Sequence, residues 1–167
     1  MGSRSRLKTA RLGNHELRPE RKETELVQQS PAYLVERFYY DLWNTANETL
    51  AWEILHPDFR FRASLGPEKI GPSGFIEYMR LIHTALSSYW CTIQEMLETG
   101  ERVAARLRFS GVHRAMFFGM PPTGREIVWT GAAFFHIIGL QIVSLWVLGD
   151  VDAVKRQLGA ASTSSGP

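Results

Sequence analysis

The sequence predicts a single α+β domain in which helices pack on one face of an antiparallel sheet. Helical apolar spacing is confined to the first part of the domain, and four long runs of strand-like residues follow it. Helices grouped before strands are typical of α+β folds. The chain has 167 residues, 44% of them hydrophobic, which suffices for one domain with a buried core and is too few for two domains of usual size.

Three helices are expected at the front of the domain. Ser30 followed by proline supplies a helix cap and a first-turn proline, and the apolar residues of 34–43 recur at helical spacing. A short second helix containing Leu50 and Ile54 stops before His56-Pro57, because proline disfavours helix in the preceding residue. Ser73 is expected to cap the third helix, which carries apolar residues at helical spacing through Leu86.

The rest of the domain is expected to form strands and one final helix. Alternation predicts a short strand over residues 59–64, and the longer strands are expected over residues 89–97, 103–113, 126–138 and 141–148. Gly139 suits the first position of a type II′ turn in the last hairpin. Asp150 is expected to cap a short helix that ends at Leu158-Gly159.

Both ends of the chain differ from the domain in composition. Residues 1–29 are predicted to be a flexible basic arm, residues 30–159 the domain, and residues 160–167 a flexible tail. The first 30 residues carry seven basic and four acidic side chains, whereas the other 137 carry twelve and thirteen, so the positive charge belongs to the arm. A nucleic-acid-binding domain should carry its excess charge on the folded body, and we therefore expect no nucleic-acid partner.

Cysteine content and hydropathy limit the class of protein further. One cysteine, Cys91, excludes an internal disulfide and a multi-cysteine zinc site, and it is expected to be a buried hydrophobe. There is no run of about 18 apolar residues and no apolar secretion signal, so no membrane association is expected. These features favour a cytoplasmic location.

From Phe38 to Gly159 the chain resembles the SnoaL-like polyketide cyclases, also called ester cyclases. The resemblance rests on RLRFSGVHRAMFFGMPPTGR at residues 106–125, on Gln157-Leu158-Gly159 with Asp150 seven residues before Gln157, and on His56-Pro57 before the first strand. It implies a nuclear transport factor 2-like fold, a cone-shaped α+β barrel whose curved, antiparallel-rich sheet wraps over three N-terminal helices. It also implies a small-molecule pocket, no cofactor and no metal.

The resemblance places apolar residues where the family carries its acid–base pair. The best-known members close a ring by intramolecular aldol condensation of an aromatic polyketide methyl ester, with a carboxylate on the last strand and a histidine on the strand before it. Ungapped alignment puts Val147 at the carboxylate position and Ala133 at the histidine position. Gly131 and Phe61 stand at two supporting polar positions. A base must reach the proton it removes, and valine cannot serve.

His113 is the remaining catalytic candidate. Strand periodicity places it on the inward face, toward the cavity mouth, where an imidazole could act as acid, base or donor; the alternative is that it holds the nearby loop. The other residues expected to line a pocket for a flat hydrophobic molecule are Tyr39, Trp43, Phe61, Tyr78, His83, Phe109, Trp129, Gly131, Ala133, Phe135 and Val147.

The opposite face of the sheet is expected to be a solvated or interfacial surface. The same periodicity turns Arg60, Arg62, Arg106 and Arg108 outward, together with Phe134, His136 and Trp146. Large aromatics on an exposed face predict a buried contact, and hence a homodimer or larger homo-oligomer, as the resemblance also implies.

Two classes of function stay open. One is a cofactor-independent enzyme of the cyclase, isomerase or hydrolase kind that acts on an apolar, ring-bearing, polyketide-like molecule. The other is a non-catalytic binding protein for a hydrophobic small molecule. An entirely apolar cavity would favour binding, whereas a carboxylate or histidine with a perturbed pKa inside it would favour catalysis.

Overall fold

A computed structural model describes residues 30–64 and 66–159 of the chain. The predicted arm, residues 1–29, and the predicted tail, residues 160–167, lie outside the described residues. The helices are α2 (Pro31–Arg37), η1 (Phe38–Trp43, a π-helix), α3 (Glu48–Ile54), α4 (Gly71–Ala85) and α5 (Val151–Gly159). The strands are β1 (Leu55–Arg62), β2 (Lys69–Ile70), β3 (Leu86–Thr99), β4 (Arg102–His113), β5 (Glu126–Ile138) and β6 (Gln141–Gly149).

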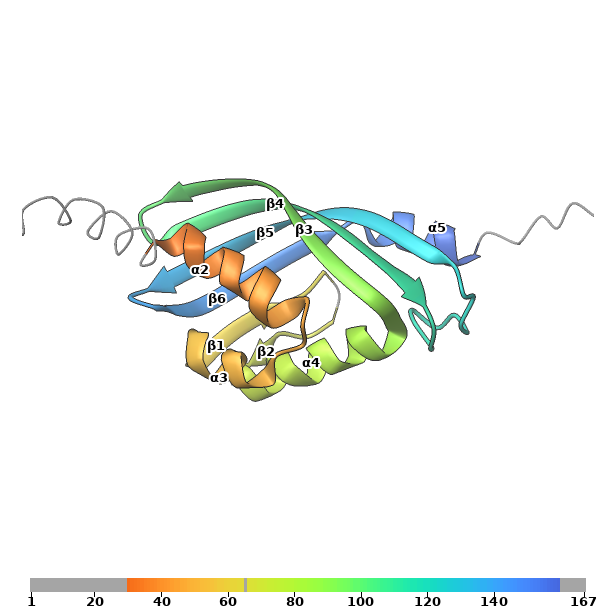
Figure 1. Cartoon of the computed structure of the whole chain (residues 1–167), viewed down its shortest axis with the longest axis horizontal. Helices are drawn as coiled ribbons and strands as arrows, with labels where there is room; N and C mark the ends of the chain where they lie inside the picture. Colours follow the sequence, from red (N-terminus) through yellow and green to blue (C-terminus); the bar gives the residue numbers. More distant parts are fainter. Residues whose placement is uncertain (1–29, 65, 160–167) are drawn as a thin grey trace, which may run out of the picture.

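The strands form one curved sheet that arches over α2 and α4, which confirms the predicted α+β, nuclear transport factor 2-like class (Figure 1). The strand order is β2-β1-β6-β5-β4-β3, so the sheet is open, with β2 and β3 as its edges. The long strands β3 to β6 are antiparallel neighbours, whereas β1 pairs in parallel with β6. Curvature and helices together enclose the space on the concave side of the sheet.

The first helix begins where the sequence predicts. The Ser30 hydroxyl accepts a hydrogen bond from the Tyr33 amide at 3.1 Å and so caps α2. The chain then continues without a break into η1, where the Asn44 amide bonds to the Tyr39 carbonyl five residues earlier. Such wider turns are rare and often lie at functional sites. Here the π-helix holds Tyr39 and Trp43, both of which contact the cavity described below.

The third helix differs from the prediction at its start. It begins at Gly71 rather than after Ser73, and no side chain caps its first turn. Gly71 has a φ of +71°, which glycine adopts readily, and Pro72 fits the first turn because its φ is already helical. A Cβ at Gly71 would lie 3.1 Å from the Pro57 carbonyl oxygen, so glycine also permits the close packing of the helix start on β1.

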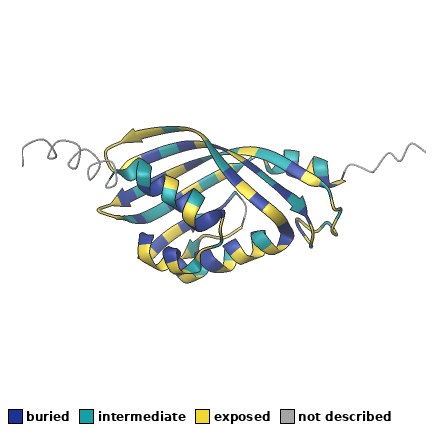
Figure 2. Cartoon of the chain, in the orientation of Figure 1, coloured by how far each residue is buried: buried dark blue, intermediate teal, exposed yellow. Residues whose placement is uncertain are grey.

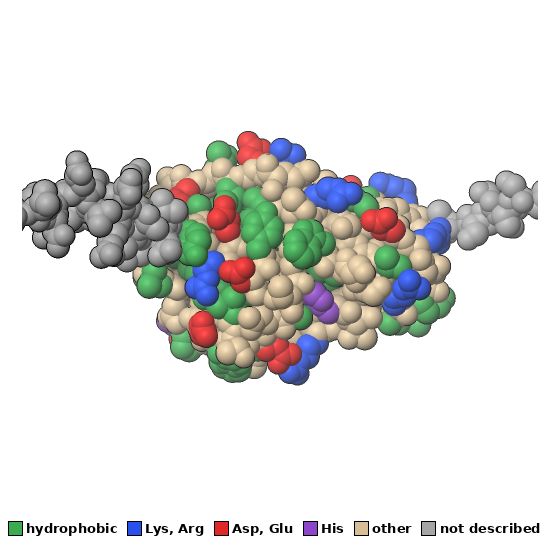
Figure 3. Space-filling view, viewed as in Figure 1, with side chains coloured by type: hydrophobic (Ala, Val, Ile, Leu, Met, Phe, Trp, Pro, Cys, Tyr) green, Lys and Arg blue, Asp and Glu red, His purple; other side chains and the backbone are tan. Residues whose placement is uncertain are grey.

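The two faces of the sheet follow the predicted alternation. Val103, Ala105, Leu107 and Phe109 of β4 are buried, and the arginines between them are exposed, as the alternating bands of Figure 2 show. On the outer face Arg60 pairs with Glu68 at 2.7 Å and Arg106 with Glu95 at 3.2 Å. Figure 3 shows acidic and basic side chains interspersed over one side of the molecule, which matches the near-neutral charge of the domain.

Candidate functional site

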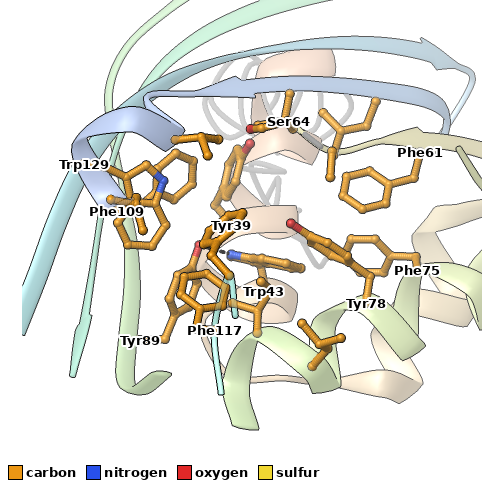
Figure 4. A pocket seen from close by; sticks show the side chains of 18 of the residues that line it. Tyr39, Trp43, Phe61, Ser64, Phe75, Tyr78, Tyr89, Phe109, Phe117 and Trp129 are labelled. Atoms are coloured by element: carbon orange, nitrogen blue, oxygen red, sulfur yellow. Dashed lines mark hydrogen bonds between the residues drawn. The ribbon is translucent and has the colours of Figure 1, made fainter. Parts of the chain in front are cut away.

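A cavity of about 230 Å³ lies between the concave face of the sheet and the helices. Most of its wall is aromatic or aliphatic (Figure 4). The lining residues come from helices, strands and loops along the whole domain, from Phe38 to Val154. The lining residues are Phe38, Tyr39, Trp43, Phe61, Ala63, Ser64, Phe75, Tyr78, Leu81, Ile82, Tyr89, Phe109, Phe117, Phe118, Trp129, Leu145, Val147, Val151 and Val154. Leu81 and Phe118 are well exposed and therefore mark the solvent side of the cavity.

Two pairs of stacked rings contribute to the wall. Trp43 stacks on Tyr78 with ring centroids 6.1 Å apart and an interplanar angle of 19°. Phe109 stacks on Trp129 at 5.2 Å and 23°. Aromatic rings prefer offset-stacked or edge-on partners, so walls of this kind suit a flat, ring-bearing molecule.

The polar groups of the cavity are hydroxyls and the indoles of Trp43 and Trp129. The Tyr89 hydroxyl accepts a hydrogen bond from Trp43 Nε1 at 2.8 Å, drawn as a dashed line in Figure 4. The Ser64 hydroxyl accepts one from the Gly149 amide at 2.6 Å. Within the described residues, the hydroxyls of Tyr39 and Tyr78 have no hydrogen-bond partner, and both residues line the cavity. These two phenols are therefore available to a bound molecule.

Burial keeps the phenols protonated. It raises the pKa of Tyr78 to about 12 and lifts the pKa of Tyr39 well above its ordinary value of 10. A protonated phenol can both donate and accept a hydrogen bond. At neutral pH the cavity therefore offers hydrogen-bond donors that carry no charge.

Seven of the residues expected to line a pocket do line this cavity. They are Tyr39, Trp43, Phe61, Tyr78, Phe109, Trp129 and Val147.

Four other expected residues, Gly131, Ala133, Phe135 and His83, are not among the described residues of the wall. Gly131 lies beneath the Phe109 ring, because a Cβ there would meet that ring at 3.0 Å. Phe135 packs edge-on against the Phe38 and Tyr39 rings of η1, and Ala133 is fully buried. His83 turns its Nε2 to the Trp43 carbonyl at 2.8 Å.

His113 lies behind the cavity wall rather than at the mouth. Its Nδ1 accepts a hydrogen bond from the Thr123 amide at 3.2 Å and lies 3.1 Å from Thr123 Oγ1. Because Nδ1 accepts, the neutral ring carries its proton on Nε2, which is buried and has no partner within the described residues. Phe117, whose ring centroid is 6.3 Å away, stands on the wall instead. This arrangement makes His113 a positioning residue for the loop between β4 and β5.

Part of the wall was not foreseen from the sequence. Phe117 and Phe118 come from the loop after β4, and Val151 and Val154 come from α5. The sequence does contain a signal for the loop contribution, because the apolar run Ala115-Met116-Phe117-Phe118 interrupts an otherwise loop-like segment. In the structure only Phe117 of its large side chains is buried, whereas Met116 and Phe118 are exposed. The α5 contribution depends on how the helix folds back on β5, which no local pattern specifies.

Within the described residues, no three metal-ligating side chains come together. No helix in this part of the chain is long and apolar enough to cross a membrane.

Comparison with known proteins identifies the family. The sequence model of the SnoaL-like polyketide cyclases matches residues 33–158, three quarters of the chain. The chain belongs to the SnoaL-like polyketide cyclase family. No match is found among curated proteins.

Solved structures share the fold at low sequence identity. A protein from Jannaschia sp. CCS1, provisionally assigned as a SnoaL-like polyketide cyclase, is 18% identical with a TM-score of 0.73, over 78% of this chain and 92% of that one. IdmH from Streptomyces antibioticus, provisionally assigned as a polyketide cyclase, is 23% identical with a TM-score of 0.70, over 78% and 99%. TsrD from Streptomyces laurentii is 24% identical with a TM-score of 0.68, over 78% and 95%.

The two positions that the resemblance assigns to the SnoaL acid–base pair are neighbours in this structure. Ala133 of β5 pairs directly with Val147 of β6, and Val147 lines the cavity. Neither side chain can exchange a proton. Within the described residues, no Asp, Glu, His, Lys or Arg lines the cavity, so phenols are its only titratable groups.

Proposed function

We propose that this SnoaL-family protein binds an apolar, ring-bearing, polyketide-like molecule in the aromatic cavity and does not use the family's carboxylate–histidine mechanism. The observation that carries the proposal is that no carboxylate or imidazole of the described residues lines the cavity. Val147, at the position that the resemblance assigns to the carboxylate, is part of this wall. General acid–base catalysis contributes about 10²–10⁴-fold, so losing the pair removes much of the parent reaction.

Aldol ring closure tests the mechanistic half of the proposal. Anthraquinone-type methyl esters are incubated with the protein, and cyclised product is followed by absorbance and mass. We expect no product above background, including from a variant with His113→Ala. Robust ring closure by the wild type would contradict the proposal, because another base would then have to serve.

A cavity-filling variant tests the binding half. Val147→Phe adds a ring inside the cavity, whereas Val112→Phe adds one on the outward-facing side of β4, away from the wall. We expect tetralin, a bicyclic hydrocarbon, to bind the wild type and the Val112→Phe control by calorimetry, and not to bind Val147→Phe. Equal binding to all three would place the ligand elsewhere.

A second candidate function is a cofactor-independent cyclase or isomerase in which a tyrosine transfers the proton. The free hydroxyls of Tyr39 and Tyr78 in the cavity favour it, as do the provisional cyclase assignments of the structural neighbours. Turnover of a panel of cyclase, epoxide and lactone substrates separates the candidates. Turnover that is lost in Tyr78→Phe supports the tyrosine enzyme, and binding without turnover supports the first proposal.

We also propose that two copies of the chain associate through the outer face of the sheet. Leu97, Ala104, Phe134 and Trp146 occupy one row across β3, β4, β5 and β6, hereafter the apolar row. The ring centroids of Phe134 and Trp146 lie 5.7 Å apart, yet the two residues are 52% and 42% exposed. Paired aromatics left in water are typical of a contact surface.

A further inference from the structure

We propose that the cavity selects a neutral molecule of about two fused rings that carries a hydrogen-bond acceptor, which Tyr78, Tyr39 and the Trp129 indole recognise. The proposal rests on the proposed binding function and specifies the chemistry of its ligand. It is carried by the size of the cavity, by donors without partners and by the absence of charge from the described wall.

The volume sets the size of the ligand. An apolar cavity of about 150 Å³ binds benzene. The present cavity of about 230 Å³ is about half as large again, so it holds a bicyclic ring system and not a larger fused skeleton. Any further ring would have to extend past Leu81 and Phe118, at the solvent side.

The hydroxyls of Tyr78 and Tyr39 are held in place and have no hydrogen-bond partner within the described residues. In Figure 4 the hydroxyl of Tyr78 points into the space between the rings, and that of Tyr39 points toward Ser64. Tyr78 is held by edge-on contact with Phe61 at 5.0 Å and by its stack on Trp43. Both phenols are thus locked by packing rather than by hydrogen bonds of their own, and each keeps its hydrogen for a ligand.

The indole of Trp129 is a third free donor. Its Nε1 has no partner within the described residues, although its ring is fixed on Phe109. Nε1 lies beside the Gly149 backbone, since a Cβ there would meet it at 3.2 Å. The same point lies 3.2 Å from the Ser64 hydroxyl, so the indole and this hydroxyl stand close together at one side of the cavity.

The wall should disfavour charged ligands, because its described residues offer no charge to compensate them. No cationic side chain of the described wall could compensate a ligand carboxylate, and no anionic one could compensate an amine. Moving an uncompensated charge out of water is costly, whereas a carbonyl needs only the donors that the cavity offers. A ketone or ester should therefore bind better than the corresponding acid.

Three bicyclic probes test the proposal by calorimetry near neutral pH: α-tetralone, tetralin and α-naphthoate. One hydrogen bond contributes about 3- to 10-fold in affinity, so wild type should bind α-tetralone more tightly than tetralin by that factor. Tyr78→Phe with Tyr39→Phe should lower the ratio to the part that the Trp129 indole contributes. Tyr33→Phe is the matched control, because this α2 tyrosine is outside the cavity wall and should leave the ratio unchanged. α-Naphthoate should bind at least about 10-fold more weakly than α-tetralone.

The outcomes separate this proposal from the function it rests on. Equal affinity of wild type for α-tetralone and tetralin would overturn the selection for an acceptor, while binding in the cavity would stand. A preference that is undiminished in the double variant would overturn the role of the phenols. Tight binding of α-naphthoate would overturn the preference for neutral ligands. If Val147→Phe binds every probe as well as wild type does, the proposed function itself fails.

Discussion

Gly131→Ala should destabilise the protein although general backbone arguments predict the reverse. Gly131 lies on β5 opposite Gly149 of β6, with an ordinary strand conformation. Alanine at a compatible strand position normally stabilises by about 0.5–1 kcal/mol, because the unfolded chain loses freedom. In this structure, however, a Cβ would lie 2.7 Å from the Leu148 carbonyl oxygen and 3.0 Å from the Phe109 ring.

The contact with the Leu148 carbonyl oxygen, a backbone atom, makes Gly131→Ala destabilising rather than stabilising. The Phe109 ring could move a few tenths of an ångström, but the Leu148 carbonyl belongs to the β5–β6 ladder and cannot move alone. Overpacking costs about 1–3 kcal/mol. Subtracting the entropic gain of about 0.5–1 kcal/mol leaves a net loss of about 0–2.5 kcal/mol, centred near about 1 kcal/mol. A loss of about 1 kcal/mol corresponds to about 3–5 °C in melting temperature for a domain of this size.

Thermal unfolding followed by circular dichroism measures the effect, with Gly149→Ala as the matched control. The three atoms nearest to a Cβ at Gly149 would be side-chain atoms of Ser64 and Trp129, at 3.2–3.3 Å. These are side-chain rather than backbone atoms and the contacts are longer than at Gly131, so the control should lose less stability than Gly131→Ala. A melting temperature for Gly131→Ala equal to or above that of wild type would refute the reasoning, since the close β5–β6 approach would then be relieved at no cost.

Three further predictions concern pH, assembly and the arm. The free energy of unfolding should fall between pH about 10 and about 12, because the Tyr78 phenol loses its proton near pH 10 in the unfolded chain but only near pH 12 in the folded one. Urea titrations should show that Tyr78→Phe removes roughly 2–3 kcal/mol of that fall. Light scattering at micromolar concentration should give at least twice the 19.0 kDa chain mass, and Trp146→Glu should give a monomer while Trp52→Glu on α3 should not; a monomeric wild type would exclude the contact. Deleting residues 1–29, which the structure does not describe, should change the melting temperature by no more than a few degrees, and a large loss would show that the arm docks.

Local patterns were sufficient to predict most elements of the fold. Proline, glycine and capping residues mark the ends of helices. The alternation of apolar and polar residues predicts β4, which starts one residue before the predicted Val103 and ends at His113 as predicted. The parallel pairing of β1 with β6 carries no local signal, because its partners lie more than 80 residues apart. The two-residue strand β2 is too short for any periodicity to show.

The cavity was predictable to the extent that strand periodicity and helical spacing determine which side chains point inward. Strand periodicity correctly predicted that Ala133 and Phe135 face the inner side of the sheet. A residue that faces inward need not line the cavity, however, and these two do not. Larger side chains cover these positions, since Phe135 packs under Phe38 and Tyr39. His113 illustrates the same limit: it has the predicted parity, and the loop that follows brings Phe117 onto the wall instead.

The resemblance assigns the positions of Ala133 and Val147 to the family's acid–base pair, and their apolar side chains bear on what the cavity can do. Ala133 and Val147 are cross-strand neighbours, so a carboxylate and an imidazole at these positions would stand side by side and could share a proton. The apolar side chains of Ala133 and Val147 can offer only apolar contact. Within the described residues, the polar groups of the wall without a hydrogen-bond partner are the Tyr39 and Tyr78 hydroxyls and the Trp129 indole. Phenols with a raised pKa are weak proton donors at neutral pH but good hydrogen-bond donors. The physical chemistry of this wall therefore favours recognition of a neutral acceptor over removal of a carbon-bound proton.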